Sequence, residues 1–212
     1  MFRTFNYLII LITGFLLISC SDTEKTYWNN GNLQSELQYK NGKLNGKAVW
    51  YFENGKMEQE AYYQNNKLNG SMKRWYSNGR LETESNYTNG NLEGPAKTYD
   101  GLGKLIIEEN YLHDTIHGIY REWYPDGLPK IEGQYEKGLY SGRWMYYDPF
   151  GNVVGVGNYQ MGNGMQKAWW PNGNLKREIP YLNNLKHGEE KWYDEEGRLE
   201  KVVTYVEGKT TG

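Results

Sequence analysis

Four columns of residues recur along the chain every 24 positions, with one step of 22, and they constrain its fold more than any other feature. One glycine column is Gly31, Gly55, Gly79, Gly103, Gly127, Gly151, Gly173 and Gly197, and the other is Gly46, Gly70, Gly94, Gly118, Gly142, Gly164, Gly188 and Gly212. A tyrosine column is Tyr39, Tyr63, Tyr87, Tyr111, Tyr135, Tyr159, Tyr181 and Tyr205, and an aromatic column begins at Tyr27. A fixed period of this length indicates a repeat architecture, so residues 27–212 are predicted to be eight copies of one unit.

Each unit contains two turn signals. The first is typified by Asn54-Gly55 and the second by Asn41-Gly42. Asn-Gly between aromatic or apolar segments is a strong hairpin signal, because both residues tolerate positive φ. The segments between the turns are rich in Tyr, Trp, Leu and Val. The predicted fold is therefore all-β, an elongated single-layer antiparallel meander of about eight 24-residue hairpin repeats.

The register of the strands follows from charge pairing. If Asn54-Gly55 is a two-residue loop, then Val49 faces Glu60, and the same rule applied to every unit places opposite charges or apolar residues face to face. The opposed charges are Lys25–Glu36, Lys73–Glu84, Lys97–Glu108, Arg121–Glu132 and Lys167–Glu178, the apolar pair is Met145–Val156, and the exceptions are Val49–Glu60 and Lys191–Val202.

The same alternation sorts the side chains onto two faces. We expect the Tyr39 and Gly46 columns on one face, together with a column of Leu33, Met57, Leu81, Leu105, Leu175 and Leu199. The aromatic column and the Glu–Lys ladder are expected on the other face. The short step removes two residues between Gly162 and Gly164, and an even deletion keeps every later side chain on its face.

The first twenty residues resemble a secretory signal. Arg3 supplies a positive charge, a short apolar run follows, and Leu17-Ile18-Ser19-Cys20 resembles the bacterial lipobox, in which the cysteine is acylated. We therefore expect a signal peptide at 1–20, lipidation at Cys20, a short tether at 21–26 and the repeats at 27–212. No Asp directly follows Cys20, which favours the outer membrane; the side of that membrane is left open. A cleaved signal with an incidental cysteine is the alternative.

The repeat resembles the MORN repeat variant found in YwqK-type antitoxins. The resemblance rests on Tyr39–Gly46, which reads Tyr-x-x-Gly-x-x-x-Gly, and on the aromatic pair and Asn-Gly that follow. It implies an elongated curved sheet used for binding rather than catalysis. Standard MORN repeats continue Gly-x-Gly, whereas this chain has other residues at the third position, such as Ala48 and Trp144. That departure weakens any transfer of a lipid-binding role.

The sequence indicates no enzyme, no cofactor and no metal site. The histidines His113, His117 and His187 are assigned to the repeat scaffold, and common nucleophile, zinc and phosphate-loop motifs are absent from the sequence. Glu36, Glu60, Glu84, Glu108 and Glu132 form an acidic row that the Lys and Arg ladder neutralises. The net charge is −2 and charges of both signs are interspersed, so the sequence has no basic patch of the kind that binds nucleic acid.

The aromatic column has two interpretations, packing of a thin sheet or a platform that stacks sugars or peptides. As a binding face it comprises Tyr51, Trp75, Tyr99, Trp123, Tyr147, Trp169 and Tyr193. The expected function is a membrane-anchored scaffold that binds a protein or an envelope polymer. The alternative is an antitoxin or immunity protein. We also expect weak self-association through the last strand, around 200–206, whose backbone groups form a sheet edge.

Overall fold

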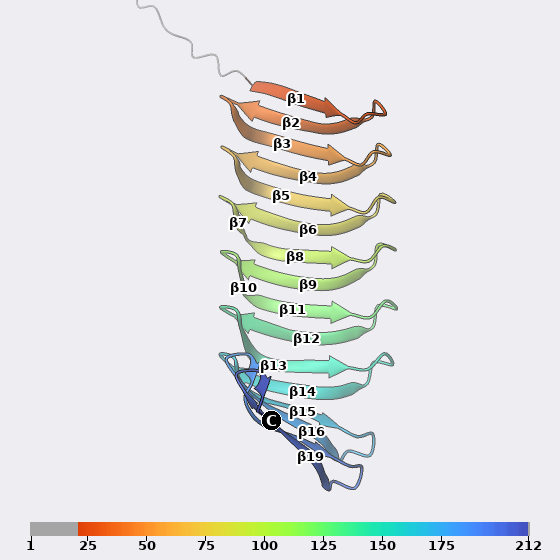
Figure 1. Cartoon of the computed structure of the whole chain (residues 1–212), viewed down its shortest axis with the longest axis vertical. Helices are drawn as coiled ribbons and strands as arrows, with labels where there is room; N and C mark the ends of the chain where they lie inside the picture. Colours follow the sequence, from red (N-terminus) through yellow and green to blue (C-terminus); the bar gives the residue numbers. More distant parts are fainter. Residues whose placement is uncertain (1–20, 212) are drawn as a thin grey trace, which may run out of the picture.

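The computed structural model describes residues 21–211, and over that range the chain is a single antiparallel sheet without helices (Figure 1). Its strands are β1 (Ser21–Tyr27), β2 (Leu33–Lys40), β3 (Lys43–Tyr51), β4 (Met57–Gln64), β5 (Lys67–Trp75), β6 (Leu81–Thr88), β7 (Asn91–Leu92), β8 (Gly94–Tyr99), β9 (Leu105–Leu112), β10 (Thr115–Ile116), β11 (Gly118–Trp123), β12 (Pro129–Glu136), β13 (Leu139–Tyr147), β14 (Val153–Gln160), β15 (Asn163–Trp169), β16 (Leu175–Leu182), β17 (Leu185–Lys186), β18 (Gly188–Tyr193), β19 (Leu199–Val206) and β20 (Lys209–Thr210). The long strands pair antiparallel in chain order, and the two-residue strands β7, β10 and β17 extend β8, β11 and β18 along the same partners, so the predicted all-β meander of repeated hairpins is confirmed.

The two ends of the sheet differ from the sequence predictions. Residues 21–26, expected to be a tether, belong to β1, and Ser21 lies opposite Lys40 at the far end of β2. The segment pairs with β2 along its whole length and extends the ladder by one strand. At the other end, Lys209 and Thr210 of β20 pair with β19, so the edge predicted to be open is partly covered. The signal residues 1–20, Cys20 among them, and Gly212 lie outside the described residues.

Every cross-strand pair derived from the charges is confirmed, including Lys25–Glu36, Arg121–Glu132 and Met145–Val156. The local geometry that produces this register is different. The first turn is a three-residue loop: the Phe52 N–H bonds the Lys56 carbonyl and the Gly55 N–H bonds the Phe52 carbonyl. A β-bulge at the start of the next strand then absorbs one extra residue and restores the register.

That bulge also changes which face one column occupies. Met57 lies directly opposite Tyr51, and Leu81 lies opposite Trp75. Residues directly opposite one another share a face, so the Leu33 column lies beside the aromatic column. The prediction that it accompanies Tyr39 is therefore wrong, because counting alternate residues ignores the extra one in the bulge.

The second turns are the two-residue loops. Both central residues have positive φ, as at Asn41 (52°) and Gly42 (72°), which defines the hairpin turn that Asn-Gly favours. These turns stack along one side of the sheet. The Gly90 N–H, for example, bonds the Leu68 carbonyl of the preceding unit.

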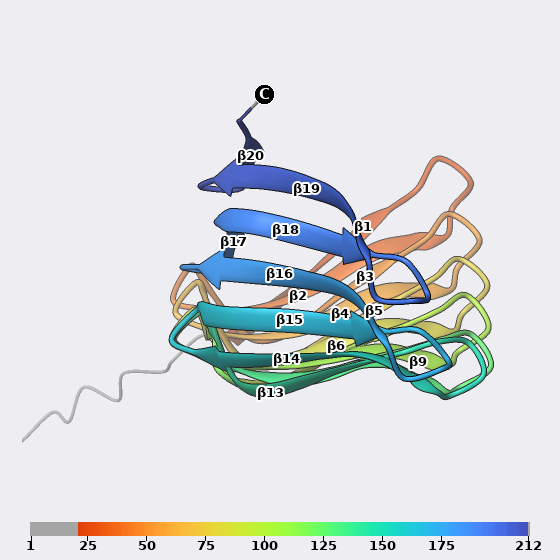
Figure 2. The ribbon, with the colours of Figure 1, turned by 90° about the horizontal axis from the view of Figure 1, so that it is seen from below.

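The sheet is not straight but turns a corner between β13 and β16, so that the C-terminal strands project across the end of the sheet (Figures 1 and 2). The rings of Tyr140 in β13 and Tyr181 in β16 lie 6.3 Å apart. Three strand spacings in a flat sheet would separate them by about 14 Å. The sheet is therefore folded toward the face that carries the Tyr39 and Gly46 columns, which we call the concave face.

The shortened repeat explains the corner. In the hairpin β4–β5 the register shifts near the second turn, and the following Gly70 has φ of 121°. The β14–β15 hairpin pairs without a shift from Gly155 to Gln160, so the two missing residues remove this bulge. The Asn184 side chain then reaches past the shortened turn, accepting from the Tyr140 N–H (2.7 Å) and donating to the Gly138 carbonyl (2.8 Å).

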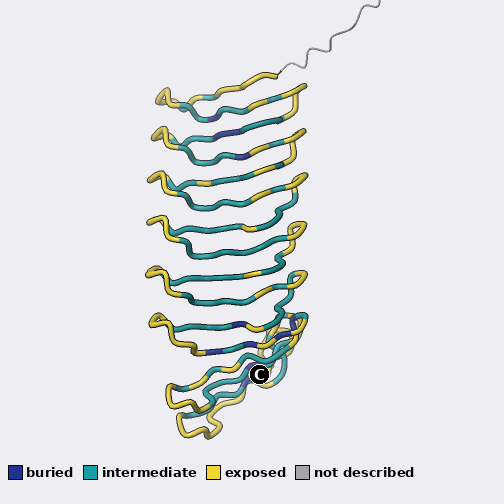
Figure 3. Tube along the Cα trace, turned by 180° about the vertical axis from the view of Figure 1, so that it is seen from behind, coloured by how far each residue is buried: buried dark blue, intermediate teal, exposed yellow. Residues whose placement is uncertain are grey.

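Aromatic rings fill the inside of the corner, and Figure 3 shows the buried residues that gather there. Trp144 is only 3% exposed. Its ring contacts those of Tyr120, Tyr135, Tyr140 and Tyr159, at centroid distances from 4.7 to 6.5 Å. Burial raises the pKa of the nearby Tyr146 phenol to about 12. This cluster is the largest core in a sheet that is otherwise one layer thick.

Restoring the two missing residues should straighten the sheet. Inserting Lys-Leu after Gly162 reproduces the order Gly42-Lys43-Leu44, so we expect the bulge to return and β15–β20 to continue in line with the preceding strands. Small-angle X-ray scattering should then show a larger maximum dimension. The same insertion after Gly151, at the tip of a first turn, should leave the shape unchanged. Equal dimensions for the two insertion variants would contradict this cause of the corner.

Candidate functional site

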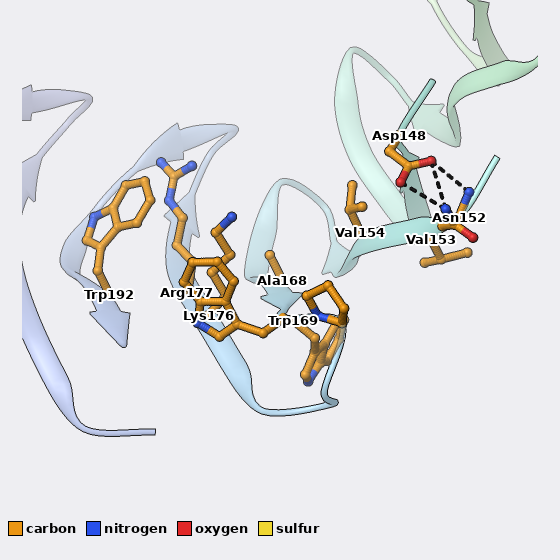
Figure 4. Close-up of a pocket in the computed structure, with 11 residues that line it drawn as sticks. Asp148, Asn152, Val153, Val154, Ala168, Trp169, Lys176, Arg177 and Trp192 are labelled. Atoms are coloured by element: carbon orange, nitrogen blue, oxygen red, sulfur yellow. Dashed lines mark hydrogen bonds between the residues drawn. The ribbon is translucent and has the colours of Figure 1, made fainter. Parts of the chain in front are cut away.

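A cleft opens at the corner, on the side where the first turns lie (Figure 4). Its volume is about 810 Å³. Its walls are formed by the turn before β14, by the end of β15, by the turn between β15 and β16, by the start of β16, and by β18. The lining residues are Asp148, Asn152, Val153, Val154, Ala168, Trp169, Trp170, Pro171, Lys176, Arg177 and Trp192. Ala168, Arg177 and Trp192 lie opposite one another in a row across three strands of the concave face.

The cleft opens because the stack of first turns is interrupted. In the other units a side chain joins each first turn to the next unit, as when the Trp28 indole donates to the Tyr51 carbonyl and the Tyr124 hydroxyl to the Tyr147 carbonyl. Asp100 also stands at the aromatic position, but there the Lys104 ammonium donates to the Pro125 carbonyl and joins the turn to the next unit. At the corner Asp148 takes that position, and within the described residues no side-chain hydrogen bond joins its turn to the next unit. Its carboxylate accepts from the Phe150 N–H and from the Asn152 backbone and amide, all within the same turn.

Two cations lie over tryptophan rings in the cleft. The Lys176 ammonium is 4.1 Å from the Trp170 ring centroid, and the Arg177 guanidinium is 4.0 Å from that of Trp192. A cation over an indole face is held by the ring quadrupole. Among residues 21–211, Lys176 makes no ion pair.

A buried carboxylate fixes the second cation. Glu190 is 1% exposed and pairs with Arg177 and with Lys186, whose ammonium is 2.7 Å from Oε2. Burial alone would raise the pKa of Glu190, but the hydrogen bonds from Lys186 and Arg177 outweigh it and hold the pKa below the ordinary value. Two cations against one carboxylate leave this cluster with a net positive charge.

The rim of the cleft is apolar and exposed. Val153, Val154 and Trp169 are 45%, 38% and 37% exposed, and Phe150 at the adjoining turn tip is 85% exposed. The residues equivalent to Phe150 and Val154 are Asp126 and Lys130 one unit earlier, the apolar Leu102 and Ile106 two units earlier, and Asn78 and Glu82 three units earlier. Apolar side chains gathered at one exposed point mark a binding surface.

The predicted aromatic column is a real structural feature. Tyr51, Trp75, Tyr99, Trp123, Tyr147, Trp169 and Tyr193 are the last residues of β3, β5, β8, β11, β13, β15 and β18. Three of their hydroxyls donate to ladder carboxylates, Tyr99 to Glu84, Tyr147 to Glu132 and Tyr193 to Glu178. Burial and the bond to Glu84 raise the pKa of Tyr99 to about 12. The structure brings Trp169 alone of this column into the cleft.

The other polar columns serve the scaffold. The His117 and His187 rings each accept, through Nδ1, from a backbone N–H of the next second turn, at 3.3 and 3.4 Å. The acidic row is paired, as in Lys25–Glu36 (3.1 Å) and Arg121–Glu108 (3.3 Å). Within 21–211, no group of three or more His, Cys, Asp or Glu is placed to hold a metal ion.

Sequence reasoning missed Trp170, Lys176, Arg177 and Trp192 as members of one site. Two signals could have indicated it. Asp148, like Asp100 and Asp194, replaces an aromatic residue in the repeat pattern, and the unit of Asp148 is the one that also contains the short step.

The model of the MORN repeat variant family matches residues 23–41, 44–65, 68–89, 92–113, 116–137, 163–183 and 186–207. These segments cover more than half of the sequence, so the chain belongs to this family. Repeats of this kind generally bind rather than catalyse, which makes the chain a repeat-based binding scaffold. The segment between 137 and 163 is unmatched and contains β13 and β14, the strands that enter the corner.

The curated proteins contain no match to this chain. No helix within the described residues is long and apolar enough to cross a membrane.

Proposed function

We propose that this protein is a non-enzymatic, lipid-anchored scaffold of the cell envelope that binds a protein or an envelope component through its repeat sheet. The cleft at the corner supports binding, because it joins exposed aromatic and apolar side chains to Lys176, a cation that forms no ion pair in the described part of the chain. The sequence around Cys20 supports the anchor, and the absence of an Asp after it favours the outer membrane.

The anchor can be tested by removing its attachment point. Cys20→Ala should release the protein from the membrane, because several acyl chains provide the anchor and each buried CH₂ contributes about 0.8 kcal/mol. Membrane fractions washed with carbonate are the measurement, with Ser21→Ala as the matched control. A Cys20→Ala protein that stays in the washed membrane would contradict the lipoprotein assignment.

The binding role can be tested by recovering the partner. Full-length protein, cross-linked in native membranes and purified in detergent, should carry one protein or wall polymer reproducibly. Recovery of neither would count against the scaffold.

A second candidate is an antitoxin or immunity protein of the YwqK type, which the family resemblance favours. A lipid-anchored form would act outside the cytoplasm, on an incoming or exported toxin. A neighbouring reading frame with a toxic product would support this function. In a competition assay, that product should be more toxic to cells from which this gene has been deleted. Deletion without any such effect would exclude it.

A further inference from the structure

We propose that the corner cleft binds a polypeptide segment in which a carboxylate side chain stands next to a large apolar or aromatic one. This inference rests on the proposed binding function and names the partner class of that site. The carboxylate would pair with Lys176, and the apolar side chain would lie against Trp169, Val153 and Val154.

The charge of the site selects an acidic group. Lys176 and Arg177 are the cations of the lining, and Asp148 is its carboxylate. The Asp148 oxygens are occupied by donors of their own turn, which hold the pKa of this carboxyl below the usual range. Arg177 is paired with Glu190, whereas Lys176 is held over Trp170 and carries its charge into the cleft. A partner carboxylate would therefore meet a positioned cation whose side-chain entropy is already reduced.

The rim selects a polypeptide over a sugar. Sugar sites rely on flat aromatic faces, but one face of Trp170 and one face of Trp192 are covered by Lys176 and Arg177. What remains exposed is a rim of Trp169, Phe150 and two valines. Aliphatic and aromatic anchors around a single charge are the pattern of protein interfaces, in which a few such residues carry most of the binding energy.

The corner itself makes the site specific to this chain. Lys130 and Tyr124 hold the repeat positions of Lys176 and Trp170 two units earlier, and there the ammonium lies farther from its ring, with 5.9 Å between Nζ and the ring centroid. There, however, Lys130 pairs with Glu122 at 2.5 Å, and the Tyr124 hydroxyl joins the next turn. The same repeat positions thus give a closed, neutral arrangement in the straight sheet and an open, cationic one at the corner.

A random dodecapeptide library displayed on phage is the probe, selected against the full chain in detergent. We expect the enriched peptides to share an acidic residue beside an aromatic or large aliphatic one. A synthetic copy should lose about ten-fold or more in affinity on Trp169→Ala and on Lys176→Gln. Trp123→Ala, in the same column outside the cleft, should bind as the wild type does, and added salt should weaken binding more in the wild type than in Lys176→Gln.

Three outcomes would overturn the proposal: enriched peptides without an acidic residue, peptides that bind the two cleft variants as tightly as the wild type, or no enrichment. Oligogalacturonate, an acidic saccharide, is titrated in parallel. If its binding depends on Trp169 and the binding of the peptides does not, the cleft binds an acidic saccharide rather than a polypeptide. Melting temperatures of all variants verify folding. If the cross-linked membrane partner is captured equally by wild type and cleft variants, the cleft assignment fails while the scaffold function stands.

Discussion

Trp144→Ala is expected to destabilise the protein by about 3–5 kcal/mol, the cost of deleting a buried tryptophan. Its ring is the centre of the corner cluster, and its indole N–H donates to the Gln134 carbonyl at 3.1 Å. The loss should fall on β12–β16, because stability in a repeat protein is a sum of local terms. Urea unfolding followed by tryptophan fluorescence is the measurement.

A companion variant separates packing from mere hydrophobicity. The Trp144 indole lies against Gly133 of the neighbouring strand, where a Cβ would overlap the ring. Gly133→Ala should therefore cost about 1–3 kcal/mol, as overpacked cores do. The straight part of the sheet has Leu37 opposite Ala48 at the equivalent positions, so a large side chain faces a small one there too. Gly133→Ala should therefore change the free energy of unfolding very little in the Trp144→Ala background. If the losses of the two substitutions add up in the double variant, the two side chains do not compete for the same space.

The register could be predicted from the sequence because the ladder charges lie in the middle of the strands. Lys73–Glu84 and Lys167–Glu178 are far enough from the turns that a three-residue loop followed by a bulge gives the same pairing as a two-residue loop. The error appears next to the turn, where Met57 lies opposite Tyr51 and the Leu33 column changes face. Register in mid-strand therefore carried no information about the local turn geometry.

The corner could not be predicted by counting alternate residues. The deletion at Gly162–Gly164 keeps later side chains on their faces, as expected, but it also removes a bulge. Counting alternate residues does not detect a bulge, because it assumes a regular strand. The unit that enters the corner has Gly155 and Gly157 on the concave face, where rings from Tyr146 and Tyr159 approach the backbone. These glycines and Trp144 depart from the repeat and form the inside of the corner, whereas the cleft beside it is lined in part by members of the repeat columns, Trp169 and Trp170.

The cleft depends on the corner, and neither the repeat pattern nor the curved sheet that the resemblance implies indicates a corner at this place. Trp169 was selected for its column, yet the same column contains Tyr99, whose hydroxyl is bonded to Glu84. Membership of a column did not distinguish the two. What distinguishes Trp169 is its place at the corner, which is a three-dimensional consequence of the two missing residues.

Glu190→Ala is expected to destabilise the C-terminal strands by about 3–5 kcal/mol, because removing one partner leaves Arg177 and Lys186 uncompensated around a buried position. Chemical denaturation of the full chain at neutral pH measures the loss. Glu190→Gln keeps the shape of the side chain and removes only its charge, so it is the matched variant for the charge itself.

The pH dependence of this pair has a defined sign. The folded pKa of Glu190 lies below the ordinary value of 4.5, so the unfolded chain binds the proton more tightly than the folded one. The contribution of the carboxylate is complete above the unfolded pKa and is lost as the pH falls through the folded pKa. The stability gap between wild type and Glu190→Gln should therefore be constant from neutral pH down to about 5 and should shrink below that. A gap that stays constant into strong acid would mean that Arg177 and Lys186 do not stabilise the ionised form.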